Sequence, residues 1–219
     1  MTRKELIAQI QSDSPFISNQ ELVYEVVLSD LLSHTLKGGE KISQGKLGSE
    51  FNLSRGPIKI ALERLEKEGF LVKNEDGSFF VRDTDPYFMG NIYTFKRQLD
   101  LLATSQAIYD ISKEKLELLH QNIKQMCEAL QASDYLKFQE CDMEFHLIIV
   151  DVAHNPLLKE TYQRYQNLFR FVALSNTVDE HLLKRLLHQH QRIYMAIKSR
   201  NPETVEAAVD AHYSSLMLF

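Results

Sequence analysis

The segment from Ser54 to Gly69, SRGPIKIALERLEKEG, constrains the fold more than any other stretch of this 219-residue chain. The Ser54 hydroxyl is expected to cap a helix, and Pro57 suits the first helical turn, where its missing N–H costs nothing. Gly69 is expected to end that helix. Apolar side chains recur at helical spacing and predict one buried face, made of Ile58, Ala61, Leu62 and Leu65.

The other face of this helix carries positive charge near its start. Arg55 and Lys59 lie four residues apart and therefore share one side, next to Gly56 and Ile60. A helix whose first turn is cationic and free of bulky side chains suits insertion into the major groove of DNA. The same residues are also compatible with ordinary solvated surface, so this helix alone does not establish DNA binding.

Composition is that of a soluble globular protein with one or two domains, at 44% hydrophobic and 25% charged residues. No apolar run approaches the roughly 18 residues of a membrane span, so we expect no membrane association. Two cysteines without metal-like spacing predict no disulfide framework and favour the cytoplasm. The net charge of −5 argues against indiscriminate coating of nucleic acid, although residues 41–64 carry five cations against two acids.

The order of predicted elements around this helix indicates a DNA-binding fold. A helix is expected over 20–36, a short edge strand at 41–42 and a second short helix over 44–51. After Gly69, two β-prone runs at 70–73 and 78–82 flank an Asp-Gly turn and predict a hairpin. This order predicts a winged helix–turn–helix domain over residues 19–83, preceded by an extension, residues 1–18, with a short helix at 3–11.

The rest of the chain, residues 84–219, is expected to be entirely helical. It has few Gly or Pro residues and no sustained period-two pattern, and Asn155-Pro156 and Asn201-Pro202 each place a proline at a helix start. The expected fold class is therefore mainly α, with a winged helix–turn–helix followed by an antiparallel bundle. Helices are expected at 86–110, 113–131, 133–154, 156–175, 179–199 and 202–218, with one break at Thr177-Val178.

Four residues of the predicted bundle form a candidate metal site. Asp142 and His146 lie four apart on one helix face, while His190 and His212 belong to the fifth and sixth helices. One carboxylate and three imidazoles suit zinc, with nickel or manganese as alternatives. His188 cannot join them, because residues two apart on a helix do not both point inward. The alternative is a surface pair at 142 and 146 with two unrelated histidines.

The N-terminal pattern SRGPIKIAL followed by RLEKEGFL resembles the DNA-binding domain of GntR-type transcription regulators. The resemblance implies that Arg55 and Lys59 contact operator bases and phosphates. It also implies that Ser54 and Gly56 approach the DNA backbone and that Gly77 forms the wing tip near the minor groove.

This sequence departs from the family pattern at several DNA-facing positions. The family often has a basic residue early in the second helix. In this sequence Gly45 stands at the nearest matching position, and Lys46 beside it is the expected DNA contact. Ile60 replaces a common acid, and either touches a thymine methyl or packs on the wing. The wing segment, residues 74–76, is acidic and would repel phosphate. The modest positive charge implies a homodimer that binds two operator half-sites.

The segments RQLDLLA, DMEFHLIIVDVAHNPLL, HQHQRIYMAI and NPETVEAAVDAHYSSL are similar to the FCD ligand-binding domain of the FadR branch of this family. The resemblance implies that the four candidate ligands, Asp142, His146, His190 and His212, hold a divalent metal. It also places Arg97 where it either clamps an effector carboxylate or pairs with Asp100 on the surface.

We therefore expect a cytoplasmic, homodimeric regulator, most simply a repressor, controlled by a small carboxylate effector bound at the metal. One alternative is a metal-dependent hydrolase built on the bundle, although Glu144, two residues from His146, lies on a different helix side. A second alternative is a regulator whose metal site is empty or purely structural.

Overall fold

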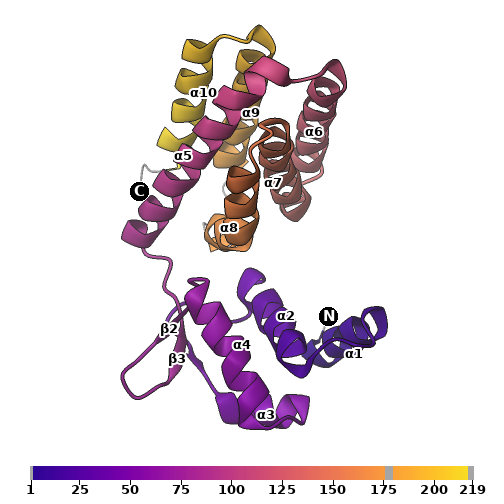
Figure 1. Ribbon diagram of the computed structural model, residues 1–219, viewed down its shortest axis with the longest axis vertical. Helices are drawn as coiled ribbons and strands as arrows, with labels where there is room; N and C mark the ends of the chain where they lie inside the picture. Colours follow the sequence, from indigo (N-terminus) through magenta and orange to yellow (C-terminus); the bar gives the residue numbers. More distant parts are fainter. Residues whose placement is uncertain (1, 176–179, 217–219) are drawn as a thin grey trace. The chain divides into compact units, whose positions relative to one another are not determined.

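The computed structural model describes residues 2–175 and 180–216. The chain divides into two compact units, Met1–Thr84 and Asp85–Phe219, and the ribbon of each can be followed in Figure 1. The break expected at Thr177-Val178 lies outside the described residues. The last helix was expected to run to residue 218, but it ends at Ser214, where Ser215 forms its C-cap. No helix in the described ranges is long and apolar enough to cross a membrane.

Four helices make up most of the first unit, and short polar side chains start three of them. Thr2, Ser18 and Ser43 each occupy an N-cap and accept a hydrogen bond from a backbone N–H in the first turn. Ser54 also occupies an N-cap, but the expected hydroxyl cap bond is absent, and that expectation was wrong. The four helices are α1 (Arg3–Asp13), α2 (Asn19–Leu32), α3 (Gln44–Phe51) and α4 (Arg55–Lys67).

Helix α4 buries the face that its spacing predicts and packs against α2, α3 and β2 (Leu71–Lys73). Gly69 has a φ of +94°, a left-handed conformation that glycine adopts without strain, and the helix ends there as expected. The Phe70 N–H then donates to the Leu65 carbonyl at 2.9 Å. The buried side chains of this face are Ile58, Ala61, Leu62 and Leu65.

Helix α2 ends at Leu32, four residues before the expected end. His34 adopts a left-handed conformation, with a φ of +52°, which turns the chain back toward the helix. The Leu36 N–H then donates to the Asp30 carbonyl at 3.2 Å. The break therefore comes from this turn rather than from the Gly-Gly pair that follows it.

The wing is a three-stranded antiparallel sheet in the order β1-β3-β2, with β1 at Lys41–Ile42 and β3 at Phe79–Val81. In this register Ile42 and Lys73 both lie opposite Phe79. Gly77, with a φ of +80°, closes the turn and donates its N–H to the Asn74 carbonyl at 2.9 Å. The expected winged helix–turn–helix is therefore present.

Helix α1 buries no side chain, yet it is attached to the first unit by charge. Arg3 forms ion pairs with Asp30 on α2 and with Glu50 on α3. Since Asp30 is buried and Glu50 lies near the end of α3, this arginine links three helices.

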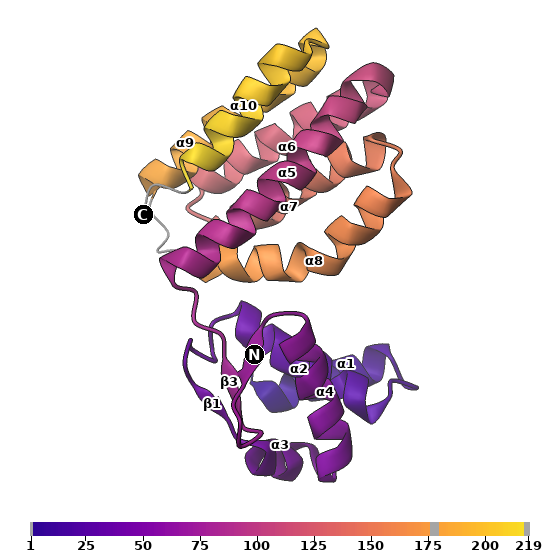
Figure 2. The same cartoon turned by 60° about the vertical axis from the view of Figure 1, so that its left-hand side comes forward.

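The second unit is a bundle of helices, and Figure 2 shows α10 lying beside α9 and α5. Asp85, Ser112, Asp134 and Asn201 provide side-chain N-caps, and prolines stand in the first turns of α5 and α10. The helices are α5 (Pro86–Asp110), α6 (Lys113–Gln131), α7 (Tyr135–Val152), α8 (Pro156–Ser175), α9 (Glu180–Ser199) and α10 (Pro202–Ser214).

The interior of the bundle is aromatic but also contains an unusual group of charged and polar side chains. Its largest fully buried side chains are Tyr162, Tyr213, Phe138, Phe145, Phe169 and Phe171. Buried polar groups are stable only when they are paired or bind an ion. Those buried in this unit are Lys96, Asp100, Thr104, Asn122, His146, Gln189, His190 and His212.

We expect Leu62→Ala to lower the stability of the first unit by about 2–5 kcal/mol, because Leu62 is 0% exposed and truncation leaves a cavity. Amide hydrogen exchange in α2 and α4 of the full-length protein measures the loss. Ile60→Ala is the matched control on the same helix, since Ile60 is 51% exposed, and we expect a change within about 0.5 kcal/mol. Equal losses in the two variants would contradict this assignment of the buried face.

Candidate metal centre and DNA interface

Three histidines from three helices meet inside the bundle. His146 of α7, His190 of α9 and His212 of α10 are all buried, and each offers a ligand atom within 4.8 Å of the other two. The ring centroids of His190 and His212 are 4.7 Å apart, and each lies 5.3 Å from that of His146. Three of the four predicted ligands are thus brought together from residues far apart in the sequence.

Hydrogen bonds to the outer nitrogens orient two of these rings. His146 Nδ1 lies 3.0 Å from Asp100 Oδ2, and His190 Nδ1 lies 2.8 Å from the Leu186 carbonyl oxygen. Since these oxygens are acceptors, each Nδ1 carries the proton and each Nε2 keeps its lone pair. Metal-binding histidines are commonly held in this way. The two Nε2 atoms face one another at 3.4 Å.

Burial favours the neutral form of His190 and His212, which is the form that binds metal. It lowers the pKa of His190 to about 4, and it lowers the pKa of His212 well below its usual value. Desolvation disfavours the charged imidazolium in both cases, and the neighbouring imidazoles add to the effect for His212. A metal therefore need not displace a proton from either ring near neutral pH.

The separations in this cluster fit a tetrahedral zinc ion. Zinc–nitrogen bonds of about 2.0–2.1 Å imply tetrahedral ligand atoms roughly 3.3–3.4 Å apart. The two facing Nε2 atoms match that spacing at 3.4 Å. His212 Nδ1 is buried and has no hydrogen-bond partner among the described residues. A bound cation would therefore relieve the repulsion between lone pairs that face one another.

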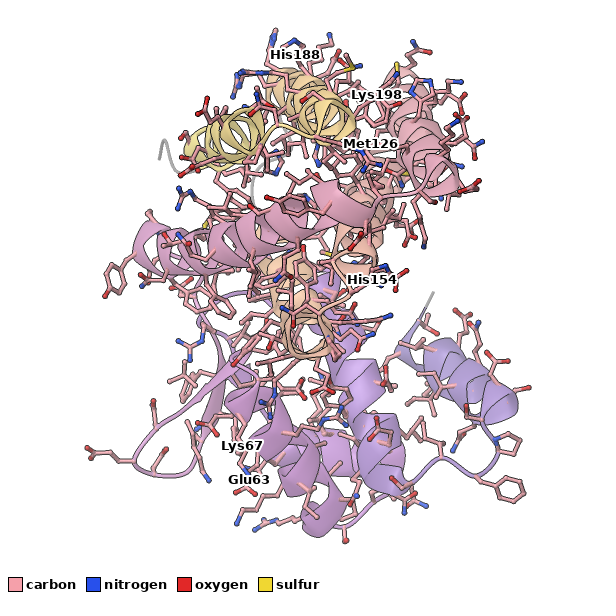
Figure 3. All side chains as sticks on the ribbon, turned by 45° about the horizontal axis from the view of Figure 1, so that its top comes forward. Glu63, Lys67, Met126, His154, His188 and Lys198 are labelled. Atoms are coloured by element: carbon pink, nitrogen blue, oxygen red, sulfur yellow. The ribbon has the colours of Figure 1, made fainter. Side chains whose placement is uncertain are left out.

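Asp142, the fourth predicted ligand, lies next to the three histidines. Its Oδ1 is 3.2 Å from His190 Nε2, and its side chain is 23% exposed, so it reaches the cluster from the more open side. His188 is exposed, and Figure 3 shows it at the outer edge of the bundle, away from the site. His190 is the inward member of that pair, as the helical spacing predicts.

Gln189 is buried next to His190 and joins two helices of the bundle. Its amide nitrogen donates to the Ala211 carbonyl at 3.0 Å and to the Ser215 hydroxyl. It therefore holds α9 against α10 close to His212.

A cavity of about 70 Å³ adjoins the cluster, and Asp142 and His212 are in its wall. Lys96 of α5 and Tyr213 of α10 also line it, beside several apolar side chains. Arg170, which is exposed, is a further basic residue of this wall. The histidine cluster and a space for a small ligand are thus continuous.

Arg97, the predicted effector-binding residue, is not among the residues that line this cavity. Its guanidinium pairs instead with Asp210 of α10, with Nη2 2.6 Å from Oδ1. The alternative, a surface pair with Asp100, was wrong, because Asp100 is buried and pairs with Lys96 at 3.0 Å. Sequence reasoning missed Lys96, although its spacing of four from Asp100 was a usable signal.

The DNA-facing residues of α4 lie together on the exposed side of the helix. Ser54, Arg55, Gly56 and Lys59 are all exposed, and Ile60 is 51% exposed. A side chain built at Gly56 would meet no atom within 4 Å, so packing does not require glycine there. The lack of a side chain at Gly56 leaves room for DNA to approach the helix closely. The Ser54 hydroxyl, which makes no cap bond, can donate to a phosphate.

A surface hollow joins the start of α4 to the start of α3 and the wing. Arg55, Lys41, Gly45 and Ser78 line this hollow, which has a volume of about 460 Å³. Arg55 forms no hydrogen bond or ion pair with another described residue. Lys41 was not predicted to belong to the interface. Lys41 comes near Arg55 only because β1 pairs with β3, and residues close to Lys41 in the sequence give no sign of this pairing.

Several other cations of the first unit form ion pairs within the protein. Arg64 pairs with Glu21 at 2.8 Å and with Glu68 at 2.9 Å, on the side of α4 that faces α2. Lys59 lies 3.8 Å from Glu63, which also binds Lys73 at 3.1 Å. Figure 3 shows Glu63 and Lys67 further along α4. Positive charge free to meet phosphate is therefore concentrated around Arg55.

Two further predicted contacts lie at the margins of this surface. Lys46 is highly exposed and 3.9 Å from Glu50, a distance that leaves its ammonium group largely free. Gly77 is half-buried in the wing turn, where Asp76 accepts hydrogen bonds from the Ser78 N–H and hydroxyl. These bonds lower the pKa of Asp76 and keep the wing tip negative.

Two family models match this chain. "Bacterial regulatory proteins, gntR family" matches residues 19–81, and "FCD domain" matches residues 91–215. The chain belongs to the GntR family and carries an FCD domain. It is therefore a DNA-binding transcription regulator and not an enzyme, and the hydrolase alternative is set aside.

Individual relatives agree with this family. The HTH-type transcriptional regulator YdhC of Bacillus subtilis is 27% identical over 87% of this chain and 86% of its own length. The transcriptional repressor RspR of Escherichia coli is 21% identical over 90% of this chain and 86% of its own length. The structure of E. coli McbR/YncC has the same fold, with a TM-score of 0.70 and 19% identity over 91% of this chain and 95% of that one.

We expect the metal-free protein to lose stability as the pH falls from about 6.5 toward 4. The folded pKa of His190 is depressed to about 4, so the stability it contributes is complete above its unfolded pKa, near 6.5, and is lost on acidification. At about pH 5 the loss should be about 2 kcal/mol. Urea unfolding with chelator present measures this loss. His190→Gln should weaken the dependence of the unfolding free energy on pH in this range, whereas His188→Gln, at an exposed site, should leave it unchanged. An unchanged pH dependence in His190→Gln would contradict the assignment.

Proposed function

We propose that this regulator is a homodimeric repressor whose operator binding is controlled by a small organic acid at a metal site in its FCD domain. The observation that carries the proposal is the convergence of His146, His190 and His212, with Asp142 at the edge of the same cluster. Zinc suits three neutral imidazoles and a carboxylate, and nickel or manganese are the alternatives. A bound metal would supply a positively charged centre that an effector carboxylate can join.

The charge on the DNA-binding surface supports a dimer. Arg55, Lys59, Lys41 and Lys46 are the main basic residues of this face, and Lys59 is partly neutralised by Glu63. So few phosphate contacts give weak binding for one copy, whereas two copies on neighbouring half-sites add their contributions. Half-sites are spaced about one helical turn, or roughly 34 Å, apart, so a small reorientation of either domain changes affinity.

Helix α5 gives the metal site a direct connection to the DNA-binding domain. Its first residue, Pro86, follows β3 after only four residues, and its Asp100 accepts the hydrogen bond from His146. A ligand that displaces α5 therefore acts on the chain that leads into the wing. The effector must bind one arrangement more tightly than the other for the equilibrium to move.

Removing the metal should lower the melting temperature of the protein, because a ligand stabilises the state that it binds. At 1,000 times its dissociation constant, a metal contributes about 4 kcal/mol. His212→Ala should abolish the difference between zinc-loaded and chelator-treated protein, whereas His188→Ala should keep it. Differential scanning calorimetry with metal analysis measures both. Retention of metal and of the melting shift in His212→Ala would contradict the proposed ligand set.

Arg55→Gln should weaken binding to an operator duplex selected from random sequences, by roughly tenfold. It should also reduce the slope of log affinity against log salt by about one per protomer, because one phosphate contact is lost. Arg64→Gln is the control, since Arg64 is neutralised by Glu21 and Glu68 and should leave the slope unchanged. Fluorescence anisotropy across a salt series measures both. Equal slopes in Arg55→Gln and the wild-type protein would exclude the contact.

A further inference from the structure

A buried lysine in the wall of the cavity is positioned to bind an anion. Lys96 is 6% exposed, and three aromatic rings surround its ammonium group, with centroids 5.4 Å (Tyr213), 5.7 Å (Tyr162) and 6.0 Å (Phe169) from Nζ. A lysine is rarely buried unless it is paired. In a site with this little water, its charge attracts an anion more strongly than it would at the surface.

The hydrogen bonds of Lys96 leave one donor unused. An ammonium group has three N–H donors and no acceptor. Among the described residues, Nζ donates to Asp100 Oδ2 at 3.0 Å and to the Tyr213 hydroxyl at 2.8 Å. Lys96 and Tyr213 both line the cavity, so a ligand in this space is within reach of the third N–H.

Charge in the site depends on the metal. Without it, the two carboxylates of Asp100 and Asp142 face the single ammonium group of Lys96. A divalent ion reverses the balance and leaves one net positive charge. The loaded site therefore favours a ligand with a single negative charge, and the metal-free site repels any anion.

The remainder of the cavity selects for small apolar groups. Its wall includes Phe138, Met143, Phe169, Leu183 and Leu186, and its volume is about 70 Å³. At 10–15 Å³ for each water-sized group, this space accepts about five such groups. That is far below the several hundred Å³ of a site for a large ligand. Apart from Gln139 and the exposed Arg170, the rest of this wall is apolar, so a second charged group on the ligand would have no buried partner there.

We propose that Lys96 binds the carboxylate of the effector and that the site selects short aliphatic monocarboxylic acids. This inference rests on the proposed metal site and deepens it. The carboxylate lies between the metal and the third N–H of Lys96, and the short apolar chain lies against the aromatic and aliphatic wall. Arg97, which is held by Asp210, takes no part.

The test is isothermal titration calorimetry of the zinc-loaded, full-length protein with propionate. Metal content is measured first, so that failure to hold zinc, which would overturn the proposed function, is recognised separately. We expect propionate to bind, and succinate, octanoate and the neutral amide propionamide to bind at least about tenfold more weakly. Metal-free protein should not bind propionate. If succinate or propionamide binds as tightly as propionate, or if the metal-free protein binds propionate equally well, the inference is wrong.

Variants at neighbouring positions identify the group that binds the carboxylate. Lys96→Met should weaken propionate binding by roughly 10- to 100-fold, the usual effect of losing a charged hydrogen bond. Metal content should not change, because Asp100 still accepts from His146 and Tyr213. Arg97→Gln is the matched control and should bind propionate as the wild type does.

If Lys96→Met does not fold, Lys96→Gln, which keeps a donor but no charge, takes its place with the same expected loss. Zinc-loaded Lys96→Met or Lys96→Gln that binds propionate within about threefold of the wild type would overturn the assignment. A loss in Arg97→Gln that equals the loss in the Lys96 variant would also overturn it.

Discussion

The interior of the FCD domain depends on the carboxylate of Asp100. Its Oδ2 atom accepts hydrogen bonds from His146 Nδ1 and Lys96 Nζ, each at 3.0 Å, and from the Tyr213 hydroxyl. These donors come from α5, α7 and α10, so one buried acid joins three helices. An unpaired carboxylate would cost several kcal/mol at this depth. The hydrogen bonds from His146 and Tyr213, together with the charge of Lys96, favour its ionised form and hold the pKa of Asp100 well below its usual value despite burial.

This network also orients the histidine cluster without a further buried acid. Asp100 orients His146 from outside the cluster, and the Leu186 carbonyl does the same for His190. Both rings consequently present Nε2 inward, while Asp142 approaches from the side of the cavity. The rings of His146 and His190 are oriented by the fold itself, so the proposed metal would cause little rearrangement on binding. In the proposed mechanism, ligand binding acts on α5 through Asp100.

The DNA-binding domain distributes its charge by a similar rule. Arg64 and Arg3 both form ion pairs within the unit, with acidic side chains that include Glu21 and Asp30 of the neighbouring helix α2. Arg55, at the opening of α4, remains free, and the glycine beside it leaves space for a phosphate backbone. A net charge of −5 for the chain therefore does not prevent DNA binding, because the local arrangement rather than the total determines the field at this surface.

Local sequence determined the helices, the wing and the buried face of α4, because caps, turn glycines and apolar periodicity act over a few residues. Helical spacing placed Asp142 and His146 on one face and made only one of His188 and His190 point inward, whereas the grouping of all four candidate ligands came from the resemblance to the FCD domain. Only tertiary structure decided that Lys96 meets Tyr213 and that Arg97 pairs with Asp210, because these partners are more than a hundred residues apart in the chain. For the same reason, neighbouring residues alone could not show that Arg97 pairs with Asp210 or that Lys96 lines the cavity.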